Sequence, residues 1–256
     1  FFPEYTVFVQ NANAKSVVLP PDTEHFQISL DALEKAITPH TRAVIINSPN
    51  NPSGVVYSAD TYEKLAALLT RKSQEIGHAI YIISDEPYRE IIYDGLPILY
   101  VPKFYKDTII CYSYSKSLSL PGERIGYVLV PDCAADAKEV YTAVCGAGRS
   151  MGFVCAPHLF QDVVLKCLGQ TSDMNIYDEN RKLLYNGLKE MGYDCVYPSG
   201  AFYLFVKSPS GDGKEFSERA KKYELLLVPS DSFGIEGYVR ISYCVDQKQI
   251  ERSAEA

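Results

Sequence analysis

The chain has 256 residues, with 25 basic and 32 acidic side chains and a formal net charge of −7. This length fits one large or two medium domains, and the composition, 46% apolar and 22% charged, excludes a mainly disordered chain. The acidic balance argues against a nucleic-acid partner, and no stretch approaches the roughly 20 apolar residues that a membrane-spanning helix needs.

The seven cysteines and four histidines are scattered along the chain. Neither a Cys-x-x-Cys pair nor a His-Glu-x-x-His motif occurs, so the sequence predicts no disulfide framework and no metal site. Because free thiols persist in reducing compartments, we expect a cytoplasmic protein.

The first two-thirds of the chain alternate apolar runs with amphipathic stretches. Strands are predicted at residues 6–10, 43–47, 80–84, 108–112 and 126–130, and helices at 29–37 and 58–76. The runs at 43–47 and 80–84 are continuous, which is typical of strands buried on both faces of a parallel sheet. Strand–helix alternation therefore predicts an α/β fold, a mostly parallel sheet with helices on both faces.

The last third has a different pattern. A long amphipathic helix at 175–191 ends before Gly192, and short strands are predicted at 194–197, 201–206, 225–228 and 238–242 around a helix at 214–223. This arrangement predicts a smaller α+β domain. We therefore expect a large domain at 1–172 and a C-terminal domain at 173–256.

Polar clusters follow three of the predicted strands, at the edge where ligands of open parallel sheets bind. They supply Asn51, Asp85, Tyr88, Ser113, Ser115, Lys116 and Arg124. Each has an ordinary structural explanation: Asn51 as a turn residue, Asp85 as a helix cap, Lys116 as a solvated lysine. Arg124 would then be a surface ion pair, and Arg240 an outward-facing residue of the last strand. Their recurrence at strand ends favours a binding site.

Five motifs occur in succession: Asn-Asn-Pro-Ser-Gly at 50–54, Ser-Asp-Glu-Pro-Tyr at 84–88, Ser-Tyr-Ser-Lys at 113–116, Pro-Ser-Gly-Ala-Phe-Tyr at 198–203 and Val-Arg-Ile-Ser at 239–242. At these residues the sequence resembles the fold type I pyridoxal-phosphate enzymes, specifically the class I and II aminotransferases related to aspartate aminotransferase. Each motif alone is weak, but all five stand in the order that the family uses.

The resemblance implies pyridoxal 5′-phosphate as cofactor and three catalytic residues. Lys116 is similar to the Schiff-base lysine, which also moves a proton at the substrate α-carbon. Asp85 is similar to the carboxylate that keeps the pyridine nitrogen protonated. Tyr88 and Asn51 resemble the groups that hydrogen-bond the 3′ oxygen of the ring.

Further binding residues are implied by the same resemblance. Arg124, with Ser113 and Ser115, would bind the cofactor phosphate, and Arg240 would bind the substrate carboxylate beside Asn51. Phe202 and Tyr203 either line the site from the small domain or serve as core aromatics.

The resemblance implies transamination between an L-amino acid and a 2-oxo acid, aspartate-type or of broad specificity, by a homodimer. Two alternatives stay open: a related carbon–sulfur lyase, and a non-catalytic aminotransferase-like sensor domain of a regulator. Members of the family begin well before the Pro-x-Tyr segment that Pro3-Glu4-Tyr5 resembles. We therefore expect a C-terminal fragment, inactive alone, that lacks the glycine-containing phosphate loop and the aromatic residue stacked on the ring.

Overall fold

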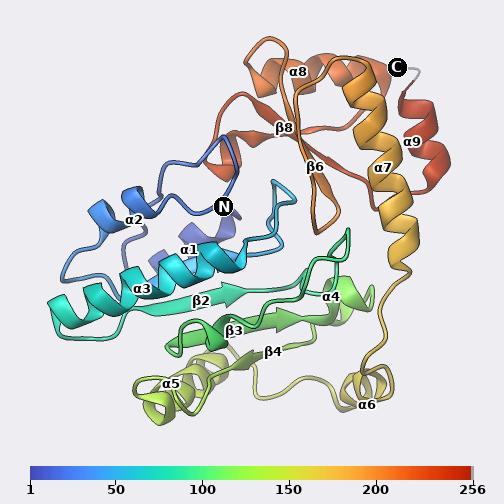
Figure 1. Cartoon of the computed structure of the whole chain (residues 1–256). Coiled ribbons are helices and arrows are strands. Elements are labelled where there is room, and N and C mark those ends of the chain that lie inside the picture. The colour runs from blue at the N-terminus through green and yellow to red at the C-terminus, as the bar shows by residue number, and fades with distance from the viewer. Residues whose placement is uncertain (255–256) are drawn as a thin grey trace.

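The computed structural model describes residues 1–254 and contains two four-stranded sheets (Figure 1). The first has the order β1-β2-β3-β4 and is formed by β1 (Ala43–Asn47), β2 (Tyr81–Asp85), β3 (Thr108–Ser113) and β4 (Gly126–Leu129). Strands β1 to β3 are parallel, and β4 is antiparallel to β3. The mostly parallel sheet predicted from the continuous apolar runs is confirmed.

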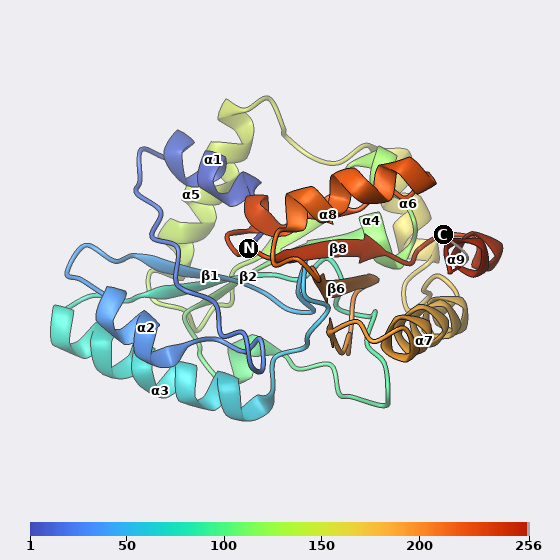
Figure 2. The same ribbon diagram turned by 90° about the horizontal axis from the view of Figure 1, so that it is seen from above.

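Helices cover both sides of this sheet. Figure 2 shows α2 (Leu30–Ala36) and α3 (Ala59–Ile76) on one side, and α1 (Glu4–Asn11) and α5 (Ala137–Ser150) on the other. Helix α3 begins where the Ser58 hydroxyl accepts a hydrogen bond from the Thr61 amide, and it ends at Gly77, which adopts φ +79°. Its residues Leu65 and Leu69 are fully buried in the core beneath β1 and β2.

The strand predicted at residues 6–10 is wrong, because these residues lie within α1. Thr6, Val7, Phe8 and Val9 favour strands locally, but β-propensity is easily overridden by context. The Thr6 hydroxyl donates to the Pro3 carbonyl in the first turn at 2.8 Å, which helps the segment to start as a helix.

The second sheet is antiparallel throughout and has the order β5-β6-β8-β7. Its strands are β5 (Cys195–Val196), β6 (Tyr203–Lys207), β7 (Val228–Pro229) and β8 (Tyr238–Ser242), with α7 (Met174–Glu190), α8 (Gly213–Ala220) and α9 (Gln247–Ser253) around them. The α+β module is confirmed, although β5, β6 and β7 are shorter than predicted. Leu226, expected in a strand, is 82% exposed and outside β7.

Short elements complete the described residues: α4 (Tyr114–Ser117), α6 (His158–Lys166), and the 3-10 helices η1 (Val101–Lys103), η2 (Pro121–Glu123), η3 (Lys221–Tyr223) and η4 (Ser230–Phe233). The domain boundary predicted at residue 172 falls between α6 and α7 and stays a prediction. None of the helices within residues 1–254 is long and apolar enough to cross a membrane.

The segment that follows β2 joins the two sheets. Tyr88, Ile91 and Tyr93 are buried in the same cluster as residues of β6 and β8, and Ile92 forms an isolated bridge with Gly200. The end of β2 is thereby fixed against the start of β6. This contact places side chains of the second sheet at the carboxyl edge of the first.

Candidate active site

The carboxyl ends of β1 and β2 lie side by side, because Asn47 and Asp85 are register partners. The Asn47 side-chain nitrogen donates a hydrogen bond to the Asp85 carbonyl at 2.9 Å. The Asn47 side-chain oxygen accepts one from the backbone N–H of Asn51 at 2.8 Å. Asn47 is buried, so these bonds replace contacts with water. One side chain therefore ties the loop at 50–54 to the end of β2.

The loop at 50–54 is packed against the second sheet. Gly54 has φ +72°, and a Cβ atom there would lie 2.6 Å from the Tyr203 carbonyl oxygen, so only glycine fits. The Gly200 amide donates to the Gly54 carbonyl at 2.8 Å. This close approach brings the Asn51 side chain to β8, where its oxygen accepts a hydrogen bond from Arg240 Nη1 at 2.8 Å.

Asp85 is half-buried at the end of β2, and its carboxylate has a partner from α1. The Tyr5 hydroxyl donates to Asp85 Oδ2 at 2.5 Å. Burial raises the pKa of Asp85, and the hydrogen bond from Tyr5 opposes that rise because it stabilises the charged form. Tyr5 therefore favours an ionised Asp85.

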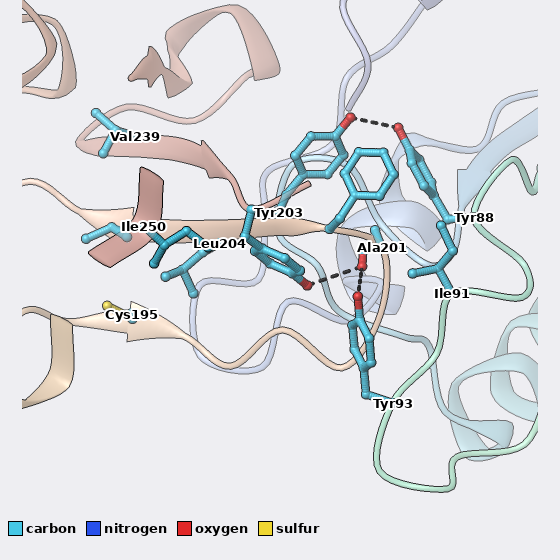
Figure 3. Packing of buried hydrophobic residues seen from close by; sticks show 12 residues of the cluster. Tyr88, Ile91, Tyr93, Cys195, Ala201, Tyr203, Leu204, Val239 and Ile250 are labelled. Atoms are coloured by element: carbon cyan, nitrogen blue, oxygen red, sulfur yellow. Dashed lines mark hydrogen bonds between the residues drawn. The ribbon is translucent and has the colours of Figure 1, made fainter. Parts of the chain in front are cut away.

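Tyr88 meets a second phenol from the other sheet. Its hydroxyl lies 3.0 Å from that of Tyr203 on β6, as the dashed line in Figure 3 shows. Both rings are buried, and burial raises the pKa of Tyr88 well above its usual value. Both phenols are therefore neutral at neutral pH.

Lys116 lies beside this pair of phenols. It is half-buried in α4, directly after β3, and its Nζ is 6.0 Å from the centroid of the Tyr88 ring and 5.5 Å from that of Phe202. An ammonium at these distances from ring faces is attracted by their π electrons. The geometry thus brings the predicted amine to the predicted phenol.

Arg240 approaches the phenol pair from β8. Its Cζ lies 4.4 Å from the centroid of the Tyr203 ring and 4.9 Å from that of Phe233. Its Nε is buried and has no hydrogen-bond partner within residues 1–254. An unsatisfied buried donor costs about 1–3 kcal/mol, which a bound carboxylate would recover.

The three residues predicted to bind a phosphate are less well assembled. Ser113 ends β3 and Ser115 lies in α4, both half-buried. Arg124 is exposed, has φ +53° after η2, and donates through Nη1 to the Pro121 carbonyl at 2.9 Å. Within residues 1–254 no hydrogen bond joins it to either serine, so the structure brings together the other predicted residues but not these three.

Three residues of the site were not assigned a role from the sequence: Tyr5, Asn47 and, in its contact with Tyr88, Tyr203. Asn47 could have been predicted from the sequence, because it ends the predicted strand at 43–47. The next predicted strand, at 80–84, ends just before Asp85, so the two residues are expected at the same edge of the sheet. Tyr5 was noted only as part of the Pro-x-Tyr segment, and the strand expected at residues 6–10 gave no reason to place its hydroxyl at Asp85. The Tyr88–Tyr203 bond joins residues 115 positions apart, and no local pattern reports such a contact.

The two-sheet fold thus gathers an amine, a carboxylate and a guanidinium at one edge of the first sheet. The family model "Aminotransferase class I and II" matches residues 1–256. The chain therefore belongs to the class I and II aminotransferase family.

Curated relatives agree with this assignment. The chain is 33% identical to the aromatic-amino-acid aminotransferase 2 of Thermococcus litoralis and 32% identical to the aspartate aminotransferase of Pyrococcus abyssi. Both alignments cover 99% of this chain but 66% of the relative. The chain thus spans about two-thirds of the length of these relatives.

Solved structures show the same fold. An amino transferase from Eubacterium rectale is 60% identical, with a TM-score of 0.97 over 100% of this chain and 64% of that chain. The aspartate aminotransferase from Thermus thermophilus with maleate is 26% identical, with a TM-score of 0.87 over 100% of this chain and 66% of that chain.

Proposed function

We propose that the whole protein transfers an amino group between an L-amino acid and a 2-oxo acid, with pyridoxal 5′-phosphate as cofactor. One observation carries this proposal: an amine and a guanidinium flank the same phenol pair. Lys116 Nζ is 6.0 Å from the Tyr88 ring, and Arg240 Cζ is 4.4 Å from the Tyr203 ring. Transamination needs an amine at the reacting carbon and a cation at the substrate carboxylate, and this spacing supplies both.

The donor set of the site fits the proposed cofactor. When bound, pyridoxal 5′-phosphate supplies an aldehyde that reacts with amines and a ring that accepts electrons from the substrate α-carbon. Asp85 would hold the ring nitrogen, and its ionised form, favoured by Tyr5, suits a protonated nitrogen. Tyr88 and Asn51 would hold the ring oxygen. The phosphate would be held by Ser113, Ser115 and Arg124.

Lys116 is proposed to link to the cofactor and then to move a proton at the substrate α-carbon. Its position beside the Tyr88 and Phe202 rings keeps the amine near apolar surface. A positioned amine of this kind is a general acid–base group when it reaches the reacting carbon.

Arg240 is proposed to bind the α-carboxylate of both substrates. The amino donor and the oxo acceptor share this carboxylate, so one guanidinium serves both half-reactions. Asn51 holds Nη1 at 2.8 Å, and the buried Nε is a donor in need of an acceptor. The relative from Thermus thermophilus was solved with maleate, a dicarboxylate, which supports an aspartate-type or broad specificity.

The protein is further proposed to act as a homodimer in the cytoplasm. Seven free cysteines within the described residues support a reducing compartment. Exposed apolar side chains support the presence of a further covering surface, among them Phe153, between α5 and α6, and Leu159, in α6. Nucleic acids and membranes are not among the proposed partners.

A panel of amino acids assayed with 2-oxoglutarate tests the function in the full-length protein. The expected result is formation of glutamate from at least one donor, with aspartate and the aromatic amino acids first to be tried. Release of pyruvate and sulfide from cysteine-type substrates without glutamate would indicate the lyase instead. Binding of the cofactor without any turnover would indicate the sensor domain.

A further inference from the structure

The Tyr203 hydroxyl is a buried polar group to which the proposed aminotransferase chemistry gives no role. Tyr203 begins β6, its ring is buried, and its hydroxyl lies 3.0 Å from that of Tyr88. Burying a hydroxyl costs free energy unless a hydrogen bond compensates, and a phenylalanine ring would fill the same space without that cost. The hydrogen bond to Tyr88 is therefore the feature that distinguishes tyrosine from phenylalanine here.

The charge of Arg240 acts on both phenols. Its guanidinium lies on the face of the Tyr203 ring, at 4.4 Å from the centroid. Burial raises the pKa of Tyr203, and the bond with Tyr88 and the charge of Arg240 oppose this rise. Burial and Tyr203 both raise the pKa of Tyr88. Either hydroxyl can donate across this distance, and Tyr88 keeps its own O–H free for another acceptor only when Tyr203 is the donor.

Surrounding contacts hold both rings in place. The Ala201 carbonyl, two residues before Tyr203, accepts a hydrogen bond from Tyr93 at 2.6 Å (Figure 3). It accepts a second one from Tyr243 at 3.2 Å. The Tyr88 ring packs edge-to-face on Tyr203, with centroids 5.7 Å apart and an interplanar angle of 81°. The two rings are thus packed so that their hydroxyls lie 3.0 Å apart.

We propose that Tyr203 is a positioning residue that acts through Tyr88. The Tyr203 hydroxyl donates to Tyr88 Oη, which orients Tyr88 so that its own O–H points to the ring oxygen of the bound cofactor. This inference rests on the proposed function, in which Tyr88 bonds that oxygen. A phenol that already accepts a hydrogen bond is a stronger donor, so Tyr203 would strengthen the bond from Tyr88 to that oxygen. The pH at which the absorbance of the loaded cofactor changes would then depend on Tyr203.

The same ring connects the two binding regions. Arg240, which is proposed to bind the substrate carboxylate, stacks on Tyr203, and Tyr203 bonds Tyr88 beside Lys116. Tyr203→Phe removes the hydrogen bond and keeps the ring beneath Arg240. Tyr203→Leu removes both, so the two variants separate the hydroxyl from the stacking surface.

The first measurement is an optical pH titration of the cofactor-loaded full-length protein. Tyr203→Phe should raise the pH midpoint of the absorbance change, by less than Tyr88→Phe does, and should leave KM close to that of the parent protein. Tyr203→Leu should also raise KM. Tyr105→Phe is the control, because Tyr105 is a buried phenol that donates to the Ile80 carbonyl in the other core. An unchanged midpoint in Tyr203→Phe would overturn the proposal.

The second measurement needs no cofactor. The protein is labelled with carbon-13 at the Cζ atom of its tyrosines and studied by NMR. The resonance of Tyr88 is the one that is missing from the spectrum of Tyr88→Phe. This resonance should move in Tyr203→Phe and stay in place in Tyr105→Phe. A Tyr88 resonance that does not respond to Tyr203→Phe would show that the two hydroxyls are not bonded. A full-length protein without any absorbance band of the cofactor would contradict the proposed function. The carbon-13 resonance of Tyr88 would still test the Tyr203–Tyr88 hydrogen bond in that case, because it needs no cofactor.

Discussion

Arg240 is the residue on which substrate binding should depend most. Its guanidinium is held by Asn51, a residue 189 positions earlier in the chain, and by the face of Tyr203. Its buried Nε leaves a donor ready for a carboxylate. We therefore expect every substrate that carries an α-carboxylate to gain binding free energy from its contact with Arg240.

Replacement of Arg240 by alanine should raise KM for the amino donor and for the oxo acceptor together. Charge-assisted hydrogen bonds contribute about 1.5–3 kcal/mol, which corresponds to an increase on the order of 10- to 100-fold. Steady-state kinetics of both half-reactions measure this change, with Arg71→Ala, in an exposed ion pair on α3, as the control. An increase for only one substrate would point to a different carboxylate site.

Tyr5 should set the pH range in which Asp85 works. Burial raises the pKa of Asp85 and the Tyr5 hydrogen bond opposes this rise, so Tyr5→Phe should raise the pKa further. Asp85 would then become protonated at a higher pH, and the acid limb of the kcat/KM profile should move to higher pH. Thr6→Val, which removes a hydroxyl from the same helix without touching Asp85, is the matched control. Coincident acid limbs in Tyr5→Phe and the parent protein would refute this role.

Among the elements, α7 carries a buried guanidinium that pairs with a partly exposed carboxylate of the first half of the chain. Arg181 is 1% exposed, and its two terminal nitrogens donate to the Asp94 carboxylate at 2.8 Å each. It also pairs with Asp178 at 2.6 Å and stacks on Tyr93 at 4.5 Å. The guanidinium thus holds α7 against the segment that carries Tyr88.

Arg181→Ala should lower the free energy of unfolding by about 3 kcal/mol, the lower end for a broken buried pair, because Asp94 is partly hydrated. Lys64→Ala, in the exposed pair with Asp60, should cost no more than about 0.5 kcal/mol. Urea denaturation compares the two variants. Similar losses in both would mean that the Arg181 network adds little to the contact between α7 and Asp94.

The same pair predicts a pH dependence. The hydrogen bond from Arg181 lowers the pKa of Asp94 from 3.8 to about 2. A carboxyl whose pKa is lowered by folding stabilises the protein above its ordinary pKa, and this contribution is lost as the pH falls from about 4 towards 2. Asp94→Asn lacks the titrating group, so its stability should fall less over that interval. Parallel losses would contradict the assignment.

Strands could be predicted from the sequence where burial in the core requires a regular pattern of apolar residues. Strands β1 and β8 have the predicted bounds, and β2 is displaced by one residue, because each has a continuous or alternating apolar run. Helix α1 was mistaken for a strand because its β-branched residues describe local preference only. Lys116, Asp85 and Tyr88 were found from motifs. The bonds of Tyr5 and Asn47 to Asp85 and of Tyr203 to Tyr88 join distant segments, which no local pattern predicts.

At the scale of the whole molecule, the segment from α5 to α6 exposes several apolar side chains. Tyr141, Met151, Phe153, Val154, Leu159 and Leu165 are each more than 60% exposed and lie on or between α5 and α6. Patches of this kind mark surfaces that other protein segments cover. The relatives are about half as long again as this chain, with 66% of their length matched.

The 256-residue chain alone should therefore bind a hydrophobic dye such as anilinonaphthalene sulfonate more strongly, per molecule, than the full-length protein does. Fluorescence titration measures the difference. Phe153→Ser with Leu159→Ser should reduce dye binding by the short chain, whereas Leu226→Ser, at an exposed site elsewhere, should not. Equal dye binding by both lengths of chain would contradict a covered surface. We also expect the short chain to bind the cofactor weakly.

Lys116 is central to the proposed chemistry, and trapping tests it most directly. The full-length protein would be incubated with pyridoxal 5′-phosphate, reduced with borohydride and mapped by peptide mass spectrometry. We predict that the cofactor mass is found on Lys116 and disappears in Lys116→Ala, while the exposed Lys103→Ala retains it. A cofactor adduct on a different lysine, or one that persists in Lys116→Ala, would contradict the account.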